Sequence, residues 1–227
     1  MSRWKLVAAA AAAVACSGLV LAVAAASGPA SPAVARTVPV AIQNGGTCGQ
    51  IFCFSPQTLT VTSGTTVTWS NATAADHTVT RCNTTACPVG PGTGTDAAFG
   101  SGLLVAGQTF SATFHGLGTY NYYCQIHGYT VMHGTVTVVA PLKITTALLP
   151  AAKVGTAYST RLAATGGVSP YIWNVTLGVL PAGLTLSHSG SISGKPTATG
   201  TSSFHVRVSD SNHPADATSK ALSITVG

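Results

Sequence analysis

Hydrophobic and polar residues alternate along much of the chain between Phe54 and Val139. A period of two residues sends successive side chains to opposite faces of a β-strand, so each alternating segment predicts a strand with one buried face. The segments are rich in threonine, valine and aromatic residues, which favour strands. The predicted strands are 58–61, 66–69, 109–114, 120–124 and 135–139. No segment has the helical period, and we expect an all-β fold.

Glycine marks the gaps between these predicted strands. Gly64, Gly107 and Gly118 fall where the chain must turn, and turns need the backbone freedom that glycine supplies. Residues 90–102 are rich in Gly, Thr and Pro and predict a longer loop. Short strands separated by such turns are typical of a β-sandwich.

A second series of alternating segments begins at Leu142, directly after Ala140-Pro141, and it contains no cysteine. A change in composition of this kind indicates a domain boundary. The length of 227 residues is enough for two ordinary domains. We therefore predict a first domain over 36–140 and a second domain over 141–227.

Residues 1–35 have the pattern of an export signal. Arg3 and Lys5 precede a long apolar stretch without charge, and the segment 33–35, Ala-Val-Ala, has the small residues of a cleavage site. Retention of this leader as an N-terminal anchor is the alternative, and only then would the protein contact the membrane. We predict a cleaved signal peptide and an exported protein that is periplasmic, secreted or on the cell surface.

The charged residues argue against one class of partner. The chain has 10 Lys and Arg against 4 Asp and no Glu, and only 6% of its residues are charged. These charges are scattered, whereas a nucleic-acid-binding protein needs a cationic cluster. We expect no nucleic-acid partner.

Cysteine usage points to one unpaired thiol. The leader contains Cys16, which would be acylated if the chain were a lipoprotein. The remaining cysteines are odd in number: Cys48, Cys53, Cys82, Cys87 and Cys124. In an oxidising compartment the two C-x4-C units predict disulfides, and the sequence leaves all three connectivities open. Cys124 is then left over.

The segment from Cys124 to Met132 places three kinds of metal donor in one short loop, because His127 lies between the thiol and the thioether. His77, after the predicted strand that contains Trp69, supplies a second imidazole. A thiolate, two imidazoles and a weak thioether are the donors of a blue-copper site, which accepts both Cu(I) and Cu(II). We predict that His77, Cys124, His127 and Met132 bind one copper ion.

Further motifs surround these four residues. They are Phe54-Ser55-Pro56, Gly64, Trp69, Asp76-His77-Thr78-Val79, Phe99-Gly100-Ser101-Gly102 and Gly118-Thr119-Tyr120. With them, the segment from Phe54 to Val139 resembles the bacterial plastocyanin-like cupredoxins. The resemblance implies a Greek-key β-sandwich that binds copper near one end, through the four residues named above.

The resemblance also implies a function. In this family the edge of the residue that matches His127 lies near solvent and passes electrons, so Gly128, Tyr129 and Val131 would form a docking surface for a redox partner protein. Thr78 stands where plastocyanins commonly have Asn, so the hydrogen bonds that brace the ligand loops are expected to differ.

The second domain carries a different set of motifs. They are Leu149-Pro150, Gly155-Thr156-Ala157-Tyr158, Pro170-Tyr171-Ile172-Trp173, Leu180-Pro181-Ala182-Gly183-Leu184-Thr185-Leu186, Ile192-Ser193-Gly194-Lys195-Pro196 and Phe204-His205-Val206-Arg207-Val208. With these it resembles the immunoglobulin-like domains of bacterial surface proteins, which implies a second sandwich with Trp173 in its core. Asp210 and Asp216 are too few carboxylates for the calcium sites of related cadherin-like modules. We predict a spacer or adhesion role with cell-surface contacts.

We expect an electron carrier and not an enzyme. Copper enzymes that use cupredoxin domains need extra histidine pairs, and the chain contains no His-x-His. We interpret His115 and His133 as structural or surface residues, because strand alternation turns His133 away from Met132. The alternative is a copper-binding or storage protein of the cell surface without redox turnover.

Overall fold

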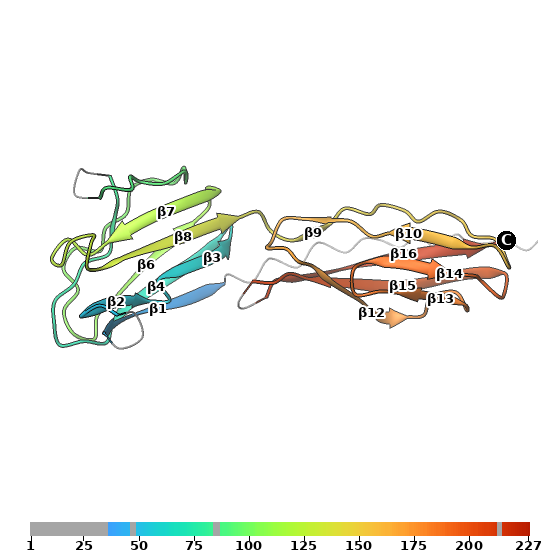
Figure 1. Cartoon of the computed structure of the whole chain (residues 1–227), viewed down its shortest axis with the longest axis horizontal. Helices are drawn as coiled ribbons and strands as arrows, with labels where there is room; N and C mark the ends of the chain where they lie inside the picture. Colours follow the sequence, from blue (N-terminus) through green and yellow to red (C-terminus); the bar gives the residue numbers. More distant parts are fainter. Residues whose placement is uncertain (1–35, 46–48, 84–86, 213–214) are drawn as a thin grey trace, which may run out of the picture. The chain divides into compact units, whose positions relative to one another are not determined.

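The computed structural model describes residues 36–45, 49–83, 87–212 and 215–227, which form strands and no helix (Figure 1). Two separate hydrophobic cores lie on either side of Ala140 in the sequence, and they define two β domains. The prediction of an all-β fold with two domains is confirmed, while the limits 36–140 and 141–227 stay predictions.

The predicted signal peptide, 1–35, lies outside the described residues. Within the described ranges, no helix is long and apolar enough to cross a membrane.

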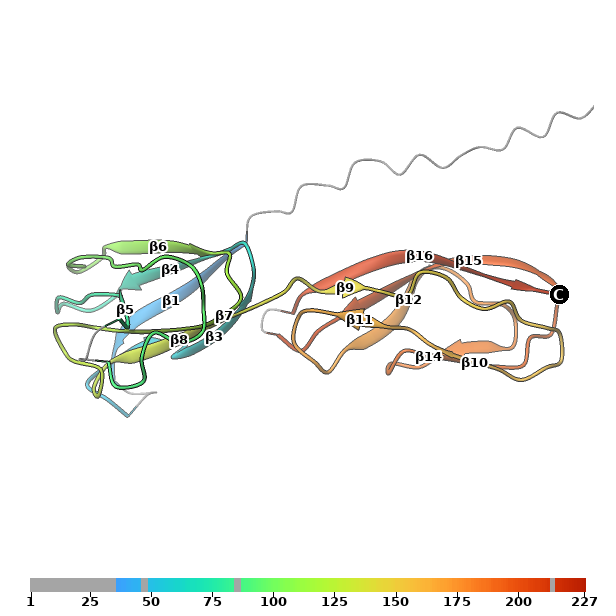
Figure 2. The ribbon, with the colours of Figure 1, turned by 90° about the horizontal axis from the view of Figure 1, so that it is seen from above.

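The first domain is built from two four-stranded sheets. Its strands are β1 (Thr37–Asn44), β2 (Phe52–Ser55), β3 (Thr58–Thr62), β4 (Thr65–Asn71), β5 (Thr80–Arg81), β6 (Thr109–Phe114), β7 (Gly118–Tyr123) and β8 (His133–Val139). The sheets have the orders β2-β1-β4-β6 and β3-β8-β7-β5. Each contains one parallel pair, β1 with β4 and β3 with β8. The two sheets face each other (Figure 2). Side chains from both sheets form one hydrophobic core.

Trp69 lies at the centre of this core. It is fully buried on β4, and its ring contacts the rings of Phe99, Phe110, Phe114 and Tyr122 at centroid distances of 5.3 to 6.3 Å. Burial of a large aromatic side chain stabilises a fold by about 3 kcal/mol. The core therefore fixes the relative positions of the strands from which the candidate metal donors follow.

The alternating pattern did not lead us to predict β1 or β2. In β1 the inward side chains of Val38, Val40 and Ile42 are buried, but Pro39 stands among them. Proline lacks the backbone N–H that a central strand needs, so it argues against a strand in the sequence. Here β1 nevertheless pairs with β2 on one side and with β4 on the other.

Two of the three predicted glycine turns are confirmed. Gly64 and Gly107 lie between strands with φ of +91° and +80°. The prediction that Gly118 lies in a gap is wrong, because it is the first residue of β7. A Cβ atom on Gly118 would lie 2.8 Å from the backbone of Thr93, so close packing explains this glycine.

The second domain is a separate set of antiparallel strands. They are β9 (Lys143–Ile144), β10 (Tyr158–Arg161), β11 (Ala164–Thr165), β12 (Ile172–Gly178), β13 (Leu184–Leu186), β14 (Ser191–Gly194), β15 (Gly200–Ser209) and β16 (Ala217–Val226). The sheets have the orders β10-β14-β13, β12-β15-β16 and β11-β9. Trp173 on β12 is buried in the core, as the sequence predicted.

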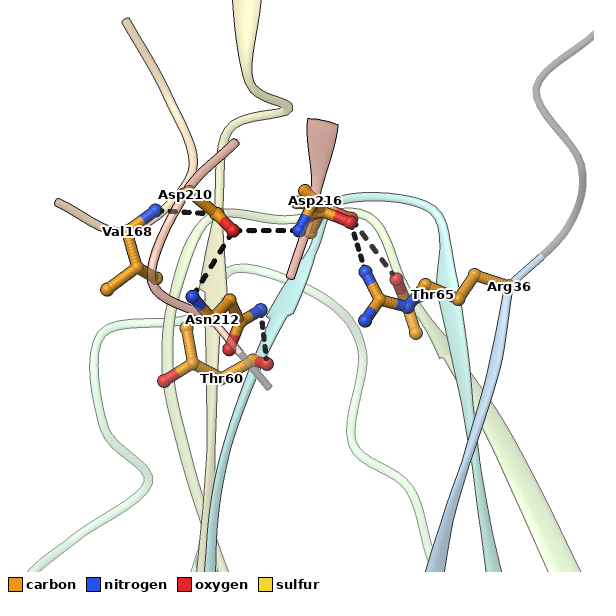
Figure 3. A network of polar contacts seen from close by, with 8 residues as sticks. Arg36, Thr60, Thr65, Val168, Asp210, Asn212 and Asp216 are labelled. Carbon is orange, nitrogen blue, oxygen red and sulfur yellow. Dashed lines mark hydrogen bonds and ion pairs between the residues drawn. The ribbon is translucent and has the colours of Figure 1, made fainter. Parts of the chain in front are cut away.

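Asp210 and Asp216, the residues considered for calcium, are bonded within the protein (Figure 3). The Asp210 carboxylate accepts hydrogen bonds from the backbone N–H of Val168 at 2.9 Å, Asn212 at 3.2 Å and Asp216 at 2.7 Å. Asp216 forms an ion pair with Arg36. These contacts give both carboxylates structural roles within the protein.

The loop between β5 and β6 is fastened by Arg81. Its guanidinium is buried, donates to the carbonyl oxygen of Gly94 at 2.7 Å and to that of Asp96, and lies 4.8 Å from the ring centroid of Tyr120. A charged donor strengthens such hydrogen bonds. The predicted loop over 90–102 is thus confirmed as irregular in structure, and it is held against the first domain.

Asp96 provides the first testable prediction. Burial tends to raise the pKa of its carboxyl group, but the backbone N–H groups of Gly116 and His115 outweigh this effect and lower the pKa below 3.8. A carboxylate with a depressed folded pKa stabilises the protein above its unfolded pKa and loses that contribution as the pH falls through the folded pKa. We expect Asp96→Ala to lower the free energy of unfolding by about 1 kcal/mol at neutral pH.

Chemical denaturation of the full chain checks this prediction at neutral pH and at pH ~3. The deficit of the variant relative to the wild type should shrink at the acidic pH. Asp76→Ala, which removes an exposed carboxylate, is the matched control and should change little. An equal deficit at both pH values would contradict the role of the Asp96 charge.

Candidate metal centre

His77 is held by its own backbone in the segment between β4 and β5. Its N–H donates to the carbonyl oxygen of Leu104 at 3.1 Å, and its carbonyl oxygen accepts from the Leu104 N–H at 2.8 Å. This pair of hydrogen bonds forms an isolated antiparallel bridge. The imidazole is fully buried, so its position is set by packing on all sides.

Cys124 and His127 lie in a tight loop between β7 and β8. The predicted strand 120–124 ends at Tyr123, and Cys124 is the next residue. The loop is closed by hydrogen bonds from Gly128 N–H to the Cys124 carbonyl at 2.9 Å and from Cys124 N–H to the Met132 carbonyl at 3.0 Å. Gly128 has φ of +74°, a conformation that favours glycine. The turn brings His127 back beside Cys124.

The donor atoms of His77, Cys124 and His127 converge. The Cys124 Sγ atom lies 3.3 Å from His127 Nδ1 and 3.9 Å from His77 Nδ1. One ligand atom from each of the three residues lies within 4.8 Å of the other two. Met132, the fourth residue of the predicted set, is buried in the core at the far end of the same loop.

Thr73 fixes the orientation of the His77 ring. The Thr73 hydroxyl lies 3.0 Å from His77 Nε2 and donates to Asn71 Oδ1 at 2.8 Å. With Nε2 held in this way, Nδ1 is left to face Cys124. Burial lowers the pKa of His77 to about 4, the neighbouring His127 lowers it too, and Asp76 opposes them. The imidazole is therefore neutral at neutral pH, which is the form that binds a metal.

Thr78 braces the two ligand loops. Its backbone N–H donates to Cys124 Sγ at 3.3 Å, and its hydroxyl oxygen accepts from the backbone N–H of Gln125 at 2.8 Å. We expected different bracing from a threonine at this position. In this chain Thr78 makes the brace with two hydrogen bonds, one through its side-chain hydroxyl and one through its backbone N–H.

The cysteine pairing agrees with the prediction that Cys124 is unpaired. Cys82 and Cys87 form a disulfide, and Cys124 is free and buried. Cys53 is also disulfide-bonded, and its partner lies outside the described residues, as Cys48 does. The Cys82–Cys87 bridge packs with the side chains of Tyr123 and Tyr129, which flank Cys124 and His127 in the sequence.

His115 and His133 are not part of the donor cluster. The His133 ring stacks on that of Tyr129 at 4.5 Å, and its Nδ1 lies 2.8 Å from the Tyr129 carbonyl oxygen. His115 uses its backbone N–H to bond Asp96. The cluster of potential metal-binding groups in the described part of the chain contains neither histidine, which agrees with a structural interpretation of both.

The first domain is similar in sequence to known proteins. Residues 40–139 match the family of copper binding proteins that contains plastocyanin and azurin. A plastocyanin of Scenedesmus fuscus is 35% identical over 86 residues, which are 37% of this chain and 85% of that protein. The chain belongs to the plastocyanin/azurin family. Its cofactor is copper, and the donors that converge at the site fit that metal, because thiolate and imidazole suit both of its oxidation states.

Two solved structures are similar to part of this chain. A purple cupredoxin from Nitrosopumilus maritimus is 30% identical, with 44% of this chain and 97% of that chain covered and a TM-score of 0.35. A reduced tryptophan-to-tyrosine mutant of amicyanin is 29% identical, with 45% and 81% covered and a TM-score of 0.34. Residues 136–227 match a family of Ig domains, which agrees with the expected immunoglobulin-like second domain.

Sequence reasoning missed Thr73 and Phe52 in this cupredoxin. Thr73 is one of many threonines, and nothing in its spacing from His77 marks it as a hydrogen-bond partner. Phe52 lies outside the segment in which we predicted strands, yet its ring contacts both imidazoles. Only the three-dimensional contacts reveal these two residues.

The hydrogen bond between Thr73 and His77 Nε2 generates a prediction. We expect Thr73→Val, which keeps the shape but removes the hydroxyl, to weaken copper binding by roughly tenfold, because residues that orient a ligand typically have effects of this size. Competition with a chelator, followed by the copper spectrum, measures the affinity. Thr68→Val is the control, since the Thr68 hydroxyl bonds Ser111 on the next strand. Equal affinities of wild type and Thr73→Val would contradict the orienting role.

Proposed function

We propose that this chain is an exported electron carrier whose single copper ion is bound by His77, Cys124, His127 and Met132. The observation that carries the proposal is the convergence of two imidazoles and one free thiol within 4.8 Å. Met132 would supply the weak axial thioether, since it follows in the same loop and its side chain is buried. Copper, when bound by such donors, supplies a one-electron couple between Cu(I) and Cu(II).

The residues around the site favour this use because they hold the donors in place. His77 is fixed by Thr73 and by its bridge to Leu104, and Cys124 is fixed by Thr78. Donors that cannot move present the same geometry to both oxidation states, so little rearrangement accompanies the gain or loss of an electron. No other reaction is required of the protein, and we propose that it is not an enzyme.

An apolar face around His127 supports docking of a redox partner protein. Ile126, directly before His127, is 52% exposed, and Ile51 is 75% exposed beside Phe52, whose ring contacts His127. Leu103 and Val105, on either side of the residue that bridges His77, are exposed as well. We propose that these four residues form one surface, the apolar face, with the predicted Gly128, Tyr129 and Val131 beside it.

Charge plays little part at this face. Residues 36–140 contain four charged side chains, and Asp76 is the one that is exposed. Arg81 is buried, and Arg36 is paired with Asp216. With Asp76 as the single exposed charge in residues 36–140, association would depend mainly on apolar contact and would respond weakly to salt.

The remaining parts of the proposal concern location. We propose that residues 1–35 direct export, and that the immunoglobulin-like domain, 141–227, serves as a spacer or contacts cell-surface components. Membrane contact would follow only from retention of the leader. A storage protein without redox turnover would give no reversible couple, so cyclic voltammetry of the copper-loaded chain separates the two functions.

The colour of the copper-loaded chain tests the ligand set. We expect Cys124→Ser to abolish the intense blue absorption, because that absorption arises from the bond between copper and thiolate, while the sandwich still folds. Visible spectra and circular dichroism of the full chain measure the two effects. His133→Gln, which removes a nearby imidazole outside the cluster, should keep the colour. A blue Cys124→Ser protein would reject the assignment.

Electron self-exchange between reduced and oxidised copies tests the apolar face. Its rate, measured by NMR line broadening, should change little with ionic strength in the wild type. We expect Ile126→Glu to slow the exchange by roughly tenfold at low salt and to make it salt-dependent, because two like charges then meet. Leu117→Glu, an exposed position at the other end of β7, should leave the rate unchanged. Equal slowing by both variants would argue against docking at this face.

A further inference from the structure

Three aromatic rings meet at the metal centre. The Phe52 ring lies 4.9 Å from the His77 ring in an edge-on arrangement and 4.5 Å from the His127 ring, as measured between centroids. The two imidazole rings are 4.7 Å apart. Phe52 therefore contacts both imidazoles of the proposed copper site, although it offers no donor atom itself.

The two imidazoles are restrained to different degrees. His77 is fully buried and is held at Nε2 by the Thr73 hydroxyl. His127 is only half-buried, and within the described residues its hydrogen bond is the one between Nδ1 and Cys124 Sγ. No described side chain bonds the Nε2 atom of His127. The orientation of the His127 ring therefore depends on the residues that pack against it.

Phe52 is itself well anchored. It lies at the start of β2, where it pairs with Asn44 of β1, and the next residue, Cys53, is disulfide-bonded. Phe52 and Phe54 point to the same face of the strand, and Phe54 is buried in the core against Tyr122. The backbone of Phe52 is thus fixed to the sandwich, so the Phe52 ring provides a rigid surface for packing.

We propose that Phe52 is a positioning residue that holds the His127 ring in the orientation in which its Nδ1 faces Cys124. Aromatic pairs at these distances contribute beyond the area they bury, and they favour particular ring angles. Since Thr73 already restrains the His77 ring, the contact with Phe52 matters mainly for the orientation of the His127 ring. The proposal rests on the copper-binding function proposed above, and it adds a residue that the sequence pattern did not mark.

Phe52→Leu in the full chain tests the proposal, with the metal-free protein examined first. In the wild type, NMR should show the His127 ring close to both the Phe52 ring and the Cys124 side chain. In Phe52→Leu the contacts between His127 and Cys124 should weaken or vanish, while those between His77 and Thr73 persist. This readout needs no copper, so it remains informative even if the proposed function fails.

The copper-loaded protein gives the second readout. Release of copper to an excess of chelator should be about tenfold faster in Phe52→Leu, in line with the strength of aromatic pairs. Phe52→Tyr keeps a ring and should restore the wild-type rate. Phe54→Leu is the matched control, because it truncates the neighbouring phenylalanine of the same strand and face without removing a ring from the imidazoles. It should lower stability but leave His127 in place.

The outcomes separate the two proposals. Unchanged contacts of His127 in metal-free Phe52→Leu, or equal effects of Phe52→Leu and Phe54→Leu on copper release, would overturn the role of Phe52. A wild-type chain that takes up no copper would overturn the proposed function, and the metal-free spectra would still decide whether Phe52 positions His127.

Discussion

The structure of the first domain depends on one constraint, that two imidazoles and one thiol from distant parts of the sequence must be held within bonding distance of a common point. Polar side chains in a protein interior are costly unless they are bonded. Here His77 bonds Thr73, and Cys124 accepts a hydrogen bond from the Thr78 N–H. The sandwich thus positions the donors through its own hydrogen bonds.

The site is rigid on one side and open on the other. His77 and Cys124 are buried, while His127 is partly exposed and follows the exposed Ile126 in the sequence. A donor set of this kind isolates a metal from water and still brings one ligand edge to the surface, as an electron carrier requires. The shortage of exposed charge in residues 36–140 is in keeping with brief apolar contacts between such a carrier and its partner.

Much of the fold was predictable where the pattern was regular. The strands at Thr58–Thr62 and Thr109–Phe114 follow clean alternation, and the structure confirms them. β1 has Pro39 among its residues, which argues against a strand in the sequence, although burial of Val40 and Ile42 outweighs it. β2 has only four residues, Phe52–Ser55, which are too few to show a clear alternation. The convergence of His77 with Cys124 and His127 was predicted, since the short loop fixes two of these residues and His77, after the strand that contains Trp69, supplies the second imidazole of the donor set.

The sequence by itself determined the two β domains, the unpaired thiol and the set of residues that could bind copper, because these follow from local periodicity, cysteine number and short spacing. The tertiary structure decided which groups support them. Thr78 and Phe52 act at the site through contacts that close only when separate strands and loops pack together, while Thr73 bonds His77 within the segment between β4 and β5. The contacts of Thr78 and Phe52 leave no periodic trace in the chain, since each depends on the position of a distant backbone and not on neighbouring residues.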